Sequence, residues 1–114
     1  MKSYQYLDPS TTTQKPEDKP LPVDYVLGPN DVLCGNGKKC FKHAGNQAFR
    51  KLIEATLNHY TSVPSKMERS CIILEVMDYV RANSEGGFVR HDPVTNTYFQ
   101  VSEKAAVSTA KHSY

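Results

Sequence analysis

A loop rich in glycine and lysine carries the residues whose types and spacing could do chemistry. Residues 35–39 read Gly-Asn-Gly-Lys-Lys, and Lys42 follows on the approach to a helix expected near Asn46. Glycines allow positive φ angles, so backbone N–H groups can gather on one side, while lysines and a helix N-terminus add positive potential. This combination is typical of phosphate or anion binding. The candidate phosphate loop consists of Gly35, Asn36 and Gly37.

The known phosphate-binding motifs do not match this loop. A Walker loop would require glycine at Val32 and serine or threonine at Lys39, and a dinucleotide loop would require glycine at Cys40. A structural turn with solvated lysines is therefore an open alternative to phosphate contact.

Cysteine and histidine near the loop raise two further chemistries. Cys34, Cys40 and His43 could ligate a metal with His59 or Cys71, but five residues between the first two cysteines exceed the usual zinc spacing. Cys40 with His43 could form a nucleophile and base, but no orienting carboxylate or oxyanion hole is evident nearby. We expect no metal, no cofactor and no catalysis, and we interpret Cys34 and Cys71 as small buried hydrophobes.

Positive charge is concentrated around the same loop. The net charge is only +2, yet residues 32–70 contain seven basic and two acidic side chains. Such a patch suits nucleic-acid phosphates, with a merely solvated basic face as the competing interpretation. The candidate nucleic-acid contacts are Lys38, Lys39, Lys42, Arg50, Lys66, Arg69 and Arg90.

The elements that must position these residues follow from periodicity and turn signals. Residues 1–23 are rich in proline, threonine and charge, which predicts a flexible tail before one domain over 24–114. Residues 32–34 predict a brief strand. Helical periodicity runs from Asn46, the expected N-cap, to about Tyr60, and a capping box at Ser65 opens a second helix ending near Asn83.

The remainder predicts a β-hairpin and a third helix. Residues 88–91 and 98–101 are predicted to form the two strands of a β-hairpin joined by a polar loop, and a capped helix starts at Ser102. The predicted fold class is α+β, a small winged-helix-like domain in which a hairpin follows a helix-turn-helix pair.

No apolar run approaches the roughly 20 residues of a membrane span, no signal peptide is evident, and the cysteine count is odd. We expect an intracellular protein without a membrane partner.

Residues 29 to about 106 resemble a domain family of unknown function that is abundant in diatoms and other stramenopile algae. The matching motifs are Asn30-Asp-Val-Leu-Cys-Gly-Asn-Gly, His43-Ala-Gly-Asn-Gln-Ala-Phe-Arg-Lys-Leu-Ile, Ser65-Lys-Met-Glu-Arg-Ser, and Gly86-Gly-Phe-Val-Arg-His-Asp-Pro with Tyr98-Phe-Gln-Val. Two departures reduce positive charge: Asn36 replaces the usual arginine, and Thr109 stands where a lysine is expected. The resemblance implies a regulatory, DNA-associated domain.

These observations lead to one functional expectation and one alternative. The expectation is a non-enzymatic DNA-binding module in which the loop and helix contact phosphates and Lys66 and Arg69 lie nearest the bases. As a DNA-binding module, this intracellular protein would work in the nucleus. The alternative is a protein-interaction or self-association domain that uses the hairpin with the aromatic residues Tyr98, Phe99 and Tyr114, which are expected to be exposed.

Overall fold

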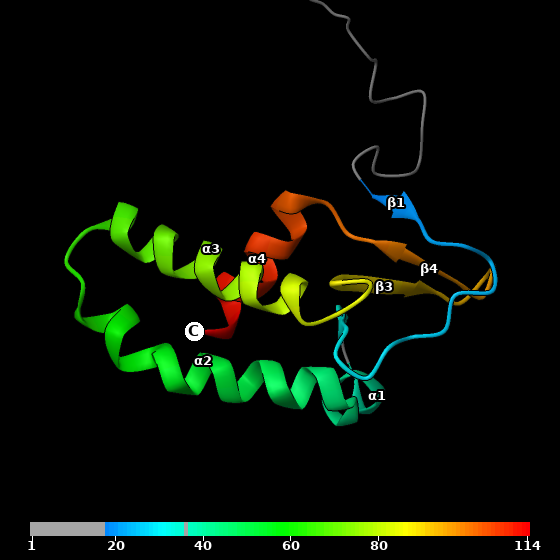
Figure 1. Ribbon diagram of the computed structural model, residues 1–114, viewed down its shortest axis with the longest axis horizontal. Coiled ribbons are helices and arrows are strands. Elements are labelled where there is room, and N and C mark those ends of the chain that lie inside the picture. The colour runs from blue at the N-terminus through cyan, green and yellow to red at the C-terminus, as the bar shows by residue number, and fades with distance from the viewer. Residues whose placement is uncertain (1–17, 36) are drawn as a thin grey trace, which may run out of the picture.

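The computed structural model describes residues 18–35 and 37–114, which form the predicted α+β fold (Figure 1). The longer helices lie on one side of the domain and a small sheet lies on the other. The helices are α1 (Lys38–Lys42), α2 (Ala44–Ser62), α3 (Lys66–Ala82) and α4 (Glu103–Ser113), and the strands are β1 (Lys19–Pro20), β2 (Val32–Leu33), β3 (Phe88–Asp92) and β4 (Thr97–Gln100).

The two long helices, α2 and α3, run side by side in opposite directions (Figure 1). The Ser65 hydroxyl caps α3 by accepting a hydrogen bond from the Glu68 N–H at 3.0 Å, which confirms Ser65 as the N-cap of the predicted capping box. Their facing apolar sides pack with β3 and α4 into one core. The central core residues are Phe49, Ile53, Ile73, Val76, Met77, Val80 and Phe88.

The sheet has the strand order β1-β4-β3-β2. The predicted hairpin is confirmed, since β3 and β4 pair antiparallel. β2 pairs parallel with β3 across the long α1–α3 connection, as parallel strands require. β1 pairs with β4 although its residues lie in the segment 1–23 assigned to a tail, of which residues 1–17 are outside the described part.

The third predicted helix is present as α4. The Ser102 hydroxyl accepts a hydrogen bond from the Ala105 N–H at 3.1 Å and so caps the helix. Ala106 and Ala110 are fully buried. Their small side chains let α4 lie close against the core.

The segment between β2 and α2 differs from the sequence expectation. Lys38–Lys42 form the short helix α1 where a loop was predicted, and α2 begins at Ala44 with His43 as its N-cap. Asn46 is therefore inside the helix and is not its cap. The likeness to a winged helix is not confirmed.

Candidate nucleic-acid interface

The glycine loop adopts the backbone that its composition predicts. Gly35 has a φ angle of 147° and Gly37 one of 104°, a region that side chains other than glycine rarely enter. Asn36 lies outside the described residues. The loop leads directly into α1, so the lysines of this helix are presented beside it.

The three lysines of α1 are exposed. Two ion pairs occur in the described part of the chain, Arg81 with Glu103 and Arg90 with Asp18, and neither includes these lysines. The ammonium groups therefore face solvent without an acidic side chain within bonding distance. We call Lys38, Lys39 and Lys42 the α1 cluster.

Arg50 fixes α1 onto α2. Its guanidinium donates a hydrogen bond to the Phe41 carbonyl at 2.9 Å and lies 4.0 Å from the centroid of the Phe41 ring. A cation over an aromatic face is favourable, and Phe41 is otherwise 63% exposed. Arg50 thus has a structural role that the sequence did not indicate.

A cavity of about 310 Å³ opens beside the glycine loop. It brings together three predicted residues, Gly35, Gly37 and Arg50, with hydroxyl groups of α4. Burial, the largest influence, raises the pKa of the Cys34 thiol at this cavity. The lining includes Gly35, Gly37, Cys40, Arg50, Thr109 and Ser113.

The Arg90 side chain makes contacts within the domain. Its Nε donates to the Asp18 carboxylate at 2.8 Å, and its guanidinium lies 4.2 Å from the Phe99 ring centroid. The Asp18 side chain is only 4% exposed and also accepts a hydrogen bond from the Ser102 N–H at 2.9 Å. The guanidinium therefore joins β3 to the segment before β1.

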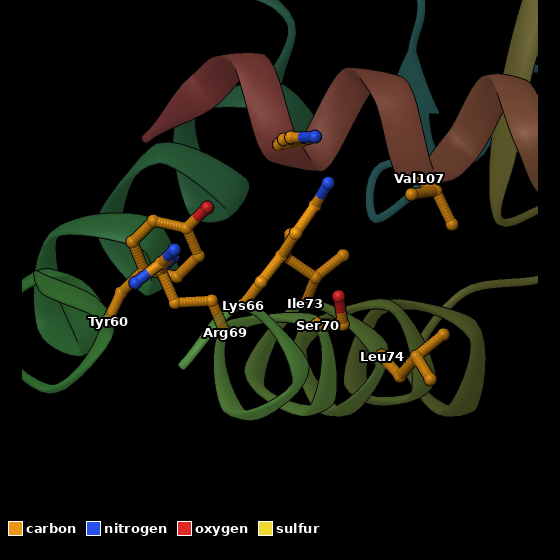
Figure 2. Close-up of a pocket in the computed structure, with 8 residues that line it drawn as sticks. Tyr60, Lys66, Arg69, Ser70, Ile73, Leu74 and Val107 are labelled. Carbon is orange, nitrogen blue, oxygen red and sulfur yellow. The ribbon is translucent and has the colours of Figure 1, made fainter. Parts of the chain in front are cut away.

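Lys66 and Arg69 lie at a separate place, the first turns of α3. α2 contains 19 residues, so its helical rise places this end about 28 Å from α1. They line a pocket between α3 and α4 together with Lys111 (Figure 2). The sequence analysis missed Lys111, because no local pattern pairs a residue near the C-terminus with the start of α3.

The aromatic residues of the protein-interaction hypothesis pack against other residues of the domain. Phe99 is 8% exposed, so the expectation of an exposed side chain is wrong for this residue. Tyr98 packs against Tyr25 at 6.0 Å between ring centroids, and Tyr114 stacks on Tyr60 at 4.0 Å. Both hairpin strands also have neighbours, β2 for β3 and β1 for β4.

The fully buried carboxylate of Asp31 is another feature that sequence reasoning missed. It accepts hydrogen bonds from the Tyr25 hydroxyl, from the Gly28 N–H at 2.7 Å and from the Gly86 N–H at 2.8 Å. The motifs that begin at Asn30 and at Gly86 could have indicated this pairing.

The histidine and asparagine of the second motif are also structural. His43 Nε2 lies 3.1 Å from the Gly28 carbonyl. The Asn46 side chain accepts from the Leu33 N–H at 2.8 Å and donates to the Leu33 carbonyl at 2.9 Å, so it pairs with β2 as a strand would. These contacts hold β2 on α2.

The cysteines do not form a metal cluster in the part of the chain that the structure describes, where no group of three or more histidine, cysteine, aspartate or glutamate side chains could hold an ion. Cys71 is exposed, so its interpretation as a buried hydrophobe is wrong. None of the helices formed by residues 18–35 and 37–114 has the length and apolar character to cross a bilayer.

The fold and the two groups of basic side chains define a small α+β domain with separate cationic surfaces. The chain belongs to the family described as Domain of unknown function (DUF6824), whose family model matches residues 31–113. Comparison with curated proteins and with solved structures finds no match.

Proposed function

We propose that this protein is a non-enzymatic DNA-binding module that contacts phosphates through the α1 cluster. The observation that carries the proposal is the exposure of Lys38, Lys39 and Lys42 on one five-residue helix, where none of them takes part in an ion pair with the described residues. Ammonium groups that release counterions from DNA give sequence-independent affinity.

The internal geometry of α1 supports this role. Lys38 and Lys42 are four residues apart, and like charges at this spacing destabilise a helix by about 0.2–0.5 kcal/mol. The Arg50 contact with Phe41 offsets this cost and keeps the lysines in place. Phosphate groups beside α1 would relieve the repulsion.

The proposed footprint is smaller than the sequence predicted. Arg50 and Arg90 stabilise the domain, and Lys66 and Arg69 lie at the opposite end of α2. Three phosphate contacts correspond to a slope of about −2.7 for log affinity against log salt, or roughly 40-fold weaker binding at 200 than at 50 mM salt.

The resemblance seen in the sequence implies a regulatory, DNA-associated domain and so agrees with the proposal, in which the protein works in the nucleus. The winged-helix comparison belongs to the same proposal. It concerns the order of the helix pair and the hairpin, while the phosphate contacts are assigned to the α1 cluster.

A fluorescence-anisotropy titration with a mixed-sequence duplex tests the proposal at about 50 and about 200 mM salt. We expect the variant K38Q/K39Q/K42Q to bind more weakly at low salt and to lose most of the salt slope. The matched control K66Q/K104Q/K111Q removes the same charge from exposed lysines elsewhere and should keep the slope. Absence of wild-type binding at low salt, or equal losses in both variants, would overturn the assignment to α1.

A further inference from the structure

The pocket between α3 and α4 combines positive charge with an apolar floor. Its volume is about 380 Å³, within the range of ligand and side-chain pockets. Figure 2 shows Lys66 and Ile73 extending from α3 toward α4, and Val107 extending from α4 into the same space. The pocket is lined by Tyr60, Lys66, Arg69, Ser70, Ile73, Leu74, Val107 and Lys111.

Three cationic side chains surround the opening, and the lining contains no carboxylate. The Arg69 guanidinium donates to the Val63 carbonyl at 3.2 Å, which holds it beside Tyr60. Neither ion pair of the described residues involves Lys66, Arg69 or Lys111. The pocket therefore presents uncompensated positive charge from two different helices.

The apolar character of the pocket continues along the surface of α3. Leu74 is 45% exposed, and Met67, one of the most exposed large apolar residues, is 77% exposed. Cys71 lies between them on the same face and is also exposed. Residues at this spacing share one side of a helix, so the pocket borders an apolar stripe of about two turns.

From this charge and shape we propose that the α3–α4 pocket docks an acidic amphipathic helix of a partner protein. One large aliphatic or aromatic side chain of that helix fills the cavity over Ile73 and Val107. Its neighbouring aspartates or glutamates pair with Lys66, Arg69 and Lys111, while a second apolar side chain covers Met67. Helix-in-groove recognition uses this pattern of apolar anchors three or four residues apart.

Charge complementarity together with the apolar floor favours a protein segment over DNA. Surfaces that bind DNA are more polar than those that bind proteins, and a phosphate would gain nothing from Ile73, Leu74 and Val107. This inference is independent of the DNA proposal, because its residues lie at the other end of α2 from the α1 cluster.

Selection of phage-displayed random peptides on the full-length protein tests the chemistry of the occupant. We expect enriched sequences with several acidic residues and with leucine or phenylalanine at helical spacing. Enrichment of basic or uncharged sequences, or no enrichment over an unrelated protein, would overturn the proposal.

Anisotropy titration of the most enriched peptide, labelled with fluorescein, tests the location. We expect K66Q/K111Q to weaken binding about tenfold, since two exposed ion pairs are lost. L74S should weaken binding similarly, whereas the matched control L57S, at a residue 38% exposed outside the pocket, should not.

The variant K38Q/K39Q/K42Q separates the two proposals. It should bind the peptide as the wild type does even though its DNA binding is reduced. Peptide affinity that falls with the α1 cluster but survives K66Q/K111Q and L74S would overturn the pocket assignment.

Discussion

The carboxylate of Asp31 accepts a hydrogen bond from the backbone N–H of Gly86, 55 residues further along the chain, at 2.8 Å. The two residues lie just before β2 and just before β3, the strands that pair in parallel. Asp31 therefore fixes the start of both strands with one side chain.

Replacement of Asp31 by asparagine should destabilise the domain by about 2–4 kcal/mol. The three hydrogen-bond donors around the buried carboxylate would then face an amide, whose N–H groups cannot accept hydrogen bonds from them. Urea denaturation followed by circular dichroism measures the change. The control D24N, at an exposed aspartate, should differ from the wild type by less than about 0.5 kcal/mol. A D31N protein as stable as this control would contradict the role of the carboxylate.

Gly45 lies where α2 passes close to the segment before β2. A Cβ atom there would lie 2.7 Å from the carbonyl carbon of Asp31 and would overlap its oxygen. G45A should therefore lower the free energy of unfolding by several kcal/mol, although alanine normally stabilises a helix by about 0.5–1 kcal/mol relative to glycine.

The comparison for Gly45 is G37A, where a Cβ atom meets nothing within 4 Å and only the positive φ angle resists the change. Thermal unfolding should rank G45A below G37A. The reverse order would show that α2 can move away from Asp31 at little cost.

Arg90 should contribute to the stability of the domain and not to DNA binding. R90Q leaves the nearly buried Asp18 carboxylate without its cation, which should cost about 2 kcal/mol. R81Q breaks the exposed pair with Glu103 and should cost less than about 1 kcal/mol. The salt slope of DNA binding should be unchanged in R90Q, and a reduced slope would return Arg90 to the interface.

The Tyr25 phenol should make the free energy of unfolding depend on pH in the alkaline range. Burial, followed by the hydrogen bond to Asp31, raises the pKa of the phenol above its ordinary value of about 10. Above this pH the unfolded chain loses a proton that the folded state keeps, so the free energy of unfolding falls as pH rises.

Urea denaturation at about pH 9 and about pH 11 checks this dependence. Y25F should lose less stability between the two pH values than the wild type does. The control Y79F, at a residue 59% exposed, should behave as the wild type. Equal losses in Y25F and the wild type would exclude Tyr25 as the source.

The local signals of the sequence were sufficient for the longer elements. Ser65 and Ser102 cap α3 and α4 as predicted, and the strand-like segments 88–91 and 98–101 on either side of a polar loop mark the hairpin. Such signals depend on neighbours within a few residues, which is why a single sequence contains them.

Contacts between distant segments were not predictable in the same way. α1 has no hydrophobic periodicity of its own and depends on Arg50 from the next helix. The Asp18–Arg90 pair joins residues 72 positions apart. At the candidate sites, composition indicated positive charge, but only the fold shows that Lys111 joins Lys66 and that Arg50 and Arg90 are used internally.

The side-chain amide of Asn46 also covers one edge of the sheet. On the side of β2 that faces away from β3, Asn46 forms hydrogen bonds with both the N–H and the carbonyl of Leu33. At the other edge, β1 has two residues, one of them Pro20, which has no N–H to donate. Among residues 18–35 and 37–114, neither edge offers a template for a further strand, so this part of the chain is protected from the edge-to-edge aggregation to which small open sheets are prone.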